Sequence, residues 1–165
     1  MSKIYVDEIA PKTTGGLVKT PTKPIWFGRM ASEQTISRGV NVKLTGFTTN
    51  KIDTANAFDG TTFTVPTGMA GIYSVTTTIS CDFDAIGNDG EVAQGFIYVN
   101  GSSYVTLRFT NVTYRDMAFV PLTITTMVDL AEGDTVESYV YLVDDNGGNA
   151  GTNTAGTTFG GHFIG

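Results

Sequence analysis

Two side chains in this chain of 165 residues have types that could serve nucleophilic or acid–base chemistry: Cys81, the only cysteine, and His162, the only histidine. A reactive thiol needs a neighbour that lowers its pKa, and nothing near Cys81 in the sequence would do so. A Ser-His triad needs a nucleophile motif such as Gly-x-Ser-x-Gly, which the chain lacks. Two residues are also too few for a His/Cys metal site. We therefore expect Cys81 to be a buried small hydrophobe and the protein not to be an enzyme.

Acidic residues offer a second kind of chemistry, because hard cations such as calcium bind carboxylate and carbonyl oxygens. Two predicted loops carry the candidate ligands, which are Asp82, Asp84, Asp144 and Asp145. EF-hand spacing is absent, and carboxylates in turns are usually solvated side chains. The sequence therefore predicts no cofactor, with calcium at these aspartates as the alternative.

The clearest structural pattern lies between Phe63 and Cys81, where a short apolar lead-in ends at Pro66 and a long alternating run follows. One face of that run carries Tyr73, Val75, Thr77, Ile79 and Cys81. The other face carries Ser74, Thr76, Thr78 and Ser80. A period of two predicts a half-buried strand, so the first face should pack on a second sheet. The second face is small and uncharged, which fits a surface close to a neighbouring subunit better than open water.

Composition and charge restrict the function. Thr is the commonest residue and Gly is also frequent, as expected for strands and turns. A formal net charge of -6 and scattered Lys and Arg argue against a nucleic-acid partner. No run approaches the ~20 apolar residues of a membrane span, and the N-terminus lacks the apolar core of a signal peptide. We expect synthesis in a cytoplasm and no membrane insertion.

Residues 1–23 differ from the rest, because prolines and paired glycines prevent any long regular element there. The segment is an N-terminal arm, either frayed or ordered only against a partner. Its apolar residues Ile4, Val6 and Ile9 are the candidates for attachment to that partner. Residues 24–165 form the domain proper.

The domain alternates short strand patterns with turns and shows no helical period. Asn100-Gly101 is the strongest hairpin signal, because both residues tolerate positive φ. We predict a long Gly/Asn loop over 144–157 and a loop with a short edge strand over 48–60. Further strands are expected at 25–31, 40–47, 92–99, 104–109, 117–128, 135–143 and 158–165, and in the second of these Val40, Val42 and Leu44 should share one face. This pattern predicts an all-β sandwich or jelly roll.

From about Pro24 onward, the order of four motifs resembles the C1q-like domain, the jelly roll shared with the tumour necrosis factor family. The motifs are Phe63-Thr-Val-Pro66 followed by Ala70-Gly-Ile-Tyr73, Tyr98-Val-Asn-Gly101, Val128-Asp-Leu-Ala-Glu-Gly-Asp-Thr-Val136 and Thr158-Phe-Gly-Gly-His-Phe-Ile164. The resemblance implies a homotrimer with aromatic and apolar residues along its axis. The aromatic candidates for trimer interface or core are Tyr73, Phe96, Tyr139, Phe159 and Phe163. Tyr139 and Tyr141 point to the other face of their strand from Val140 and Leu142. One of these faces packs on the core, so the other independently favours a partner chain that excludes water.

The arm carries a different resemblance. Ser2-Lys-Ile-Tyr-Val-Asp-Glu-Ile9 followed by Thr-Thr-Gly-Gly is similar to the opening of bacteriophage virion proteins such as fibres and head appendages. This implies a viral structural protein, a trimeric capsid decoration, cement or fibre-type appendage of the virion that binds capsid or tail proteins and contacts a host surface. The alternative is a bacterial C1q-like module that binds carbohydrate or protein.

Overall fold

The computed structural model describes residues 23–82, 92–110, 119–143 and 150–165, and within them the chain is built from strands. The strands are β1 (Ile25–Arg29), β2 (Gln34–Ile36), β3 (Val42–Lys43), β4 (Thr49–Asp53), β5 (Thr62–Thr64), β6 (Gly71–Asp82), β7 (Val92–Val99), β8 (Ser102–Thr110), β9 (Phe119–Leu130), β10 (Thr135–Val143), β11 (Ala150–Thr152) and β12 (Thr158–Phe163). In this described part we find no helix that could cross a membrane. The all-β expectation is confirmed.

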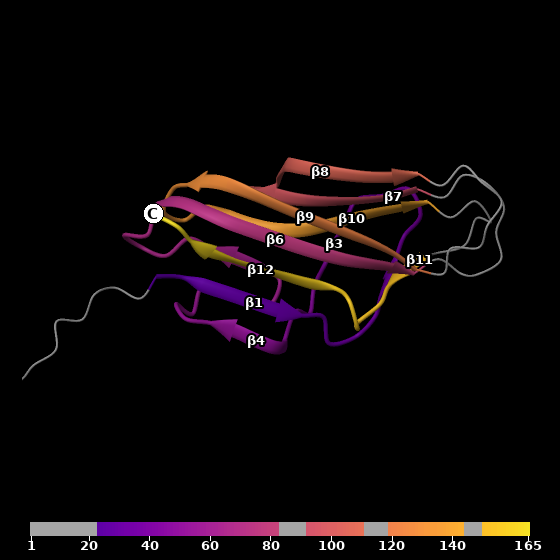
Figure 1. Cartoon of the computed structure of the whole chain (residues 1–165), viewed down its shortest axis with the longest axis horizontal. Coiled ribbons are helices and arrows are strands. Elements are labelled where there is room, and N and C mark those ends of the chain that lie inside the picture. Colours follow the sequence, from indigo (N-terminus) through magenta and orange to yellow (C-terminus); the bar gives the residue numbers. More distant parts are fainter. Residues whose placement is uncertain (1–22, 83–91, 111–118, 144–149) are drawn as a thin grey trace, which may run out of the picture.

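Two sheets pack face to face (Figure 1). In the first sheet β6 is central, with β9 on one side and β12, β1 and β4 following on the other, while β11 and β2 extend the far end. In the second sheet the order is β3-β10-β7-β8, and β5 also pairs with β10. All of these pairings are antiparallel. Most strands pair with partners that are distant in sequence, so the sheets depend on long-range contacts.

The long strand behaves as its alternation predicts. β6 runs for 12 residues, and its predicted inward set from Tyr73 to Cys81 is fully buried between the sheets. One member of that set, Thr77, is polar. Its hydroxyl lies 2.8 Å from the Ser138 hydroxyl of the opposite sheet and donates to the Thr158 carbonyl oxygen at 3.2 Å. These bonds satisfy a buried polar pair that would otherwise cost free energy.

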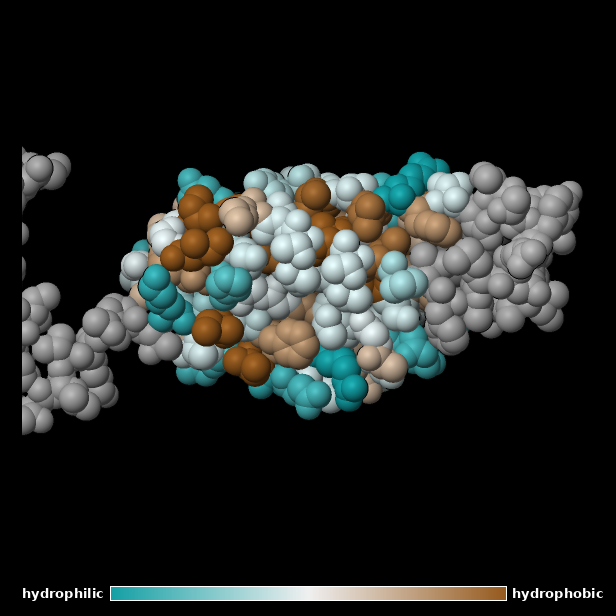
Figure 2. Space-filling view, viewed as in Figure 1, coloured by the Kyte–Doolittle hydropathy of each residue, from teal (hydrophilic) through white to brown (hydrophobic). Residues whose placement is uncertain are grey.

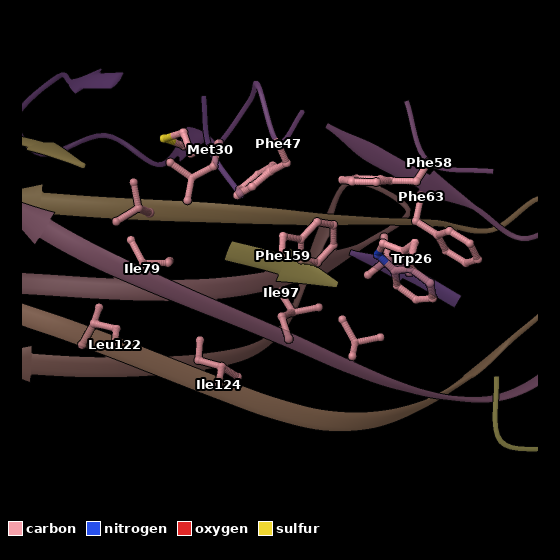
Figure 3. Packing of buried hydrophobic residues seen from close by; sticks show 14 of the residues in the cluster. Trp26, Met30, Phe47, Phe58, Phe63, Ile79, Ile97, Leu122, Ile124 and Phe159 are labelled. Carbon is pink, nitrogen blue, oxygen red and sulfur yellow. The ribbon is translucent and has the colours of Figure 1, made fainter. Parts of the chain in front are cut away.

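The core has an aromatic end and an aliphatic end (Figure 3). Trp26 of β1 stacks on Phe63 of β5 with 3.7 Å between ring centroids and nearly parallel planes. Tyr73 and Phe159 pack around the same indole at tilted or edge-on angles. Ile79, Leu122 and Ile124 lie toward the other end. Trp26 therefore joins the two sheets at the end where β6 begins.

Two turns form as the sequence indicates. Asn100 and Gly101 both have positive φ and connect β7 to β8, so the hairpin prediction is confirmed. The Asn100 side chain donates to Asp134 at 2.9 Å and accepts from the Thr135 amide, which fastens the hairpin to the turn before β10. Gly133, with a φ of 84°, supplies the bend in that second turn.

Two sequence expectations were wrong. The strand expected over 40–47 is only Val42–Lys43, because Gly39 and Gly46 both have positive φ and bend the backbone on either side. As a result Val40 is exposed, whereas Leu44 is buried. The loop expected over 144–157 contains β11, which pairs with β2, a strand the alternation did not reveal. The edge strand expected within 48–60 is present as β4.

Candidate functional site

The residues first considered for chemistry do not come together. Cys81 is buried on the inner face of β6, and burial raises the pKa of its thiol to about 12. His162 is exposed on the outer face of β12, opposite Ser74. In the described part of the chain, no three His, Cys, Asp or Glu side chains are grouped so that they could hold a metal ion. Asp82 ends β6, while Asp84, Asp144 and Asp145 lie outside the described residues, so calcium there stays a prediction.

The outer faces of the two sheets are the more informative surfaces. The strand registers place outward side chains of β9, β6, β12, β1 and β4 side by side in rows across the first sheet. We call this surface the threonine face; its residues are Met127, Ser74, His162 and Ile25 in the first row, Thr125, Thr76, Gly160, Phe27 and Ile52 in the second, and Thr123, Thr78, Thr158 and Arg29 in the third.

Hydroxyl groups on the threonine face bond to one another across strands. The hydroxyls of Thr76 and Thr125 are 3.0 Å apart, and those of Thr78 and Thr123 are 3.2 Å apart. Each pair forms one hydrogen bond within the chain, so these hydroxyls depend less on water than isolated hydroxyls would. The surface is therefore less hydrophilic than a count of threonines implies.

Exposed apolar side chains lie on both sides of the threonines, Met127 on β9 and Ile25 and Ile52 on β1 and β4. Met127 is 68% exposed, Ile52 is 50% exposed and Ile25 is 47% exposed. Figure 2 views this side of the molecule and shows a pale, near-neutral band with brown hydrophobic groups beside it. Arg29 is the one permanently charged side chain in the three rows, and its Nε atom is buried with no hydrogen-bond partner among the described residues.

A hollow of about 260 Å³ opens in the threonine face over β12. Gly160 lies in its floor, and Phe27, Thr76 and His162 are among its walls. The glycine is required by close strand packing: a Cβ atom there would lie 2.7 Å from the Trp26 carbonyl oxygen. The gap in the side-chain layer thus results from how tightly β12 approaches β1.

The outer face of the second sheet is organised differently. It carries the aromatic side chains Phe96 and Tyr98 of β7 and Tyr139 and Tyr141 of β10, and we call it the tyrosine face. Phe96 and Tyr139 are register partners, and Tyr98 stacks on Tyr139 with 4.0 Å between centroids. Phe96 meets Tyr98 edge-on, and it is only 7% exposed although it points away from the core.

Polar groups hold these rings in place. Asn41 donates from Nδ2 to the Tyr98 hydroxyl at 2.9 Å. Lys43 forms an ion pair with Glu137 at 2.5 Å and also donates to the Thr62 hydroxyl. Burial, and after it the negative charge of Glu137, raises the pKa of Tyr139 above its ordinary value. The polar groups beside these rings are therefore largely bonded within the chain.

The aromatic residues proposed for trimer interface or core now have definite positions. Tyr73 and Phe159 are fully buried in the core, and Phe163 packs edge-on to Tyr73 at 5.2 Å. Phe96 and Tyr139 lie on the tyrosine face. Whether any of them contacts another chain stays a prediction. The attachment candidates Ile4, Val6 and Ile9 lie outside the described residues.

The sequence analysis did not identify the hollow or the exposed apolar residues Met127, Ile25 and Ile52. Gly160-Gly161 was the available signal, since two adjacent glycines within a strand indicate close approach of another backbone. The outward small face of β6 was noted, but its neighbours in the sheet could not be known without the strand order.

Comparison with known proteins shows which fold the chain has. No family model matches the sequence, and no curated protein does. Among solved structures, the chain is similar to the globular domain of zebrafish complement 1qA protein, with a TM-score of 0.54 and 16% identity. The similarity covers 87% of this chain and 98% of that chain. The C1q-like jelly-roll fold expected from the motifs is therefore confirmed, and the identity is low enough that the likeness establishes the fold alone. It says nothing of the bacteriophage resemblance of the arm.

Proposed function

We propose that the protein is a non-enzymatic binding and assembly module that works as a homotrimer, with the threonine face as the surface between subunits. The observation that carries the proposal is the combination of exposed Met127, Ile25 and Ile52 with a nearly charge-free centre. Apolar patches of this kind on a folded protein are typical of interaction surfaces. The C1q-like fold supports the trimer, since such domains commonly form trimers.

The size of the face is sufficient. β6 and β9 are 12 residues long, whereas β12, β1 and β4 have six, five and five residues. With about 3.3 Å of rise per residue and about 4.8 Å between strands, the face has an area of roughly 630 Å². This is near the lower end of what stable interfaces bury, roughly 600 Å² per partner.

Native mass spectrometry of the full chain tests the assembly. A mass of three chains is expected at micromolar concentration. A single-chain mass under those conditions would contradict the proposed homotrimer.

We place this module on a bacteriophage virion, as a capsid decoration, cement or fibre-type appendage. What supports this setting is the resemblance of the arm at 1–23. The protein would be made in the host cytoplasm, and its arms would attach to capsid or tail proteins through Ile4, Val6 and Ile9. Deleting residues 1–20 should abolish particle association while leaving a soluble trimer. Unchanged association would contradict attachment by the arm.

A second candidate function, a module that binds carbohydrate or protein, is favoured by the tyrosine face. In a trimer joined through the threonine face, the opposite sheet would remain outside, and its rings have polar neighbours such as Asn41. Stacked aromatic rings beside hydrogen-bonding groups suit the faces and hydroxyls of sugars or the side chains of a protein. Binding to a glycan array that is lost in Tyr98→Ala would support this role, and an absence of binding by the wild-type trimer would count against glycans.

A further inference from the structure

Met127 is the most exposed large apolar side chain among the described residues. It lies on β9 directly opposite Ser74 of β6, which is too small to cover it. The Tyr104 hydroxyl donates to the Met127 carbonyl oxygen at 3.2 Å, so the backbone carrying this side chain is fixed. Methionine is flexible and polarisable, and it fits irregular apolar spaces well. Met127 has the properties of a projecting side chain that enters a partner.

The hollow over Gly160 has the complementary shape. Ile25 and Phe27 supply apolar walls, and Ser74, Thr76 and His162 complete the rim. Its volume of about 260 Å³ exceeds that of the four heavy atoms of a methionine side chain, if each takes roughly the ~30 Å³ of a liquid water. Since Gly160 cannot carry even a methyl group without contacting the β1 backbone, the chain cannot fill this space with a residue of its own at that position.

The projection and the hollow lie on the same face at different places. Met127 does not line the hollow, and β6 lies between Met127 and His162. A contact between two different patches is heterologous, and such contacts form a closed ring when the rotation between copies closes. We propose that Met127 of each protomer inserts into the Gly160 hollow of the next protomer, so that three identical contacts close the trimer. This inference rests on the proposed homotrimer and adds which side chain meets which cavity.

A pair of cysteines tests the contact. Within one chain, Met127 and His162 are separated by two strand spacings, which is about 10 Å, and a disulfide needs Cα atoms within ~7 Å. The double variant Met127→Cys with His162→Cys therefore cannot bridge within a chain. If Met127 enters the neighbouring hollow, oxidation should link chains and give a three-chain band on a non-reducing gel. The native Cys81 is buried and should not take part.

The matched control moves one cysteine to the other sheet. Met127→Cys with Thr106→Cys places the second thiol opposite Phe96, on the tyrosine face, and should give no inter-chain link. Suppose that native mass spectrometry shows a wild-type trimer, but the Met127→Cys/His162→Cys variant runs as single chains on the non-reducing gel. That result would overturn this contact and leave the proposed trimer unaffected. A single-chain mass for the wild type would remove the trimer itself.

Truncation gives a second readout that does not depend on disulfide geometry. Met127→Ala should weaken trimer association roughly tenfold, as expected for loss of a central buried anchor. Met127→Leu should restore most of the affinity because it again fills the hollow. Since Met127 is exposed in the single chain, neither change should alter the melting temperature of the dissociated protein. Equal affinities for Met127→Ala and the wild type would contradict the insertion.

Discussion

On the tyrosine face, the aromatic side chains stack on one another and are held by hydrogen bonds, whereas on the threonine face large apolar side chains such as Met127, Ile25 and Ile52 stay exposed. Tyr98 is held over Tyr139 by stacking and by Asn41, and Lys43 is paired with Glu137. Across the sandwich, Met127 has no cover. Both faces belong to sheets of the same kind, so strand structure alone does not decide which of them associates. The difference is whether the large outward side chains are covered within one chain, as Phe96 is and Met127 is not.

An outward aromatic residue does not by itself indicate a contact between subunits. An aromatic ring on a sheet exterior can bury itself against a neighbouring ring, as Phe96 does. Threonines pair their hydroxyls across strands, and the uncharged surface that they form suits contact with another protein. The surface with fewer aromatic residues is thus the better candidate for self-association.

The largest expected effect comes from placing a charge on the threonine face. Thr125→Lys should convert the trimer to single chains, because an unpaired ammonium group buried between subunits costs several kcal/mol. Size-exclusion chromatography with light scattering measures the change. Thr106→Lys is the matched control, since Thr106 is an exposed strand threonine on the tyrosine face. If both variants remain trimeric, or both dissociate, the assignment of the interface to the threonine face is wrong.

A smaller effect is expected from the glycines that keep β12 close to its neighbours. A Cβ atom on Gly161 would lie 2.4 Å from the Trp26 ring and 2.5 Å from the Ser74 carbonyl oxygen. Gly161→Ala should therefore lower the free energy of unfolding by about 1–3 kcal/mol through overpacking. Urea denaturation measures it, with Gly151→Ala as control because the nearest atom there is 3.6 Å away. Equal stability of the two variants would show that the indole can move aside.

The tyrosine face should affect folding stability and leave assembly unchanged. Tyr98→Phe removes the hydroxyl that accepts from Asn41 while keeping the stacked ring. We expect a loss of about 0.5–1.5 kcal/mol in unfolding free energy, the usual value of one hydrogen bond, and an unchanged trimer mass. A variant that dissociates without loss of stability would instead make this face part of the interface.

The smallest effect concerns alkaline pH. Because the pKa of Tyr139 is raised in the folded state, its contribution to stability is present below the ordinary tyrosine pKa of about 10 and is lost as the pH rises through the folded value. Glu137→Gln removes one cause of the shift, so Tyr139 should ionise at lower pH in that variant. Ultraviolet titration, with the curve of Tyr139→Phe subtracted, measures the change. An unchanged pKa of Tyr139 after replacement of Glu137 would leave burial and the neighbouring Tyr98 as the causes.

Local features of the fold were predictable from the sequence. The β6 alternation and the Asn100-Gly101 hairpin depend on side-chain period and on tolerance of positive φ, both of which are properties of neighbouring residues. β2 and β11 were not predictable, because each is three residues long and forms by pairing with distant segments, β2 with β11 and β11 also with β6. The opposite exposure of Val40 and Leu44 was not predictable either, because Gly39 and Gly46 on either side limit the strand to Val42–Lys43.

The sequence by itself determined an all-β chain, the two faces of each long strand and the unlikelihood of a catalytic thiol at Cys81. Only the tertiary structure decided which aromatic rings are core, since Tyr73 and Phe159 differ from Phe96 and Tyr139 in sheet position and not in residue type. It also decided that Met127 and the Gly160 hollow share one surface. Strand order and register arise from contacts between distant segments. They decide which side chains become neighbours on a face, and the alternation within one strand does not.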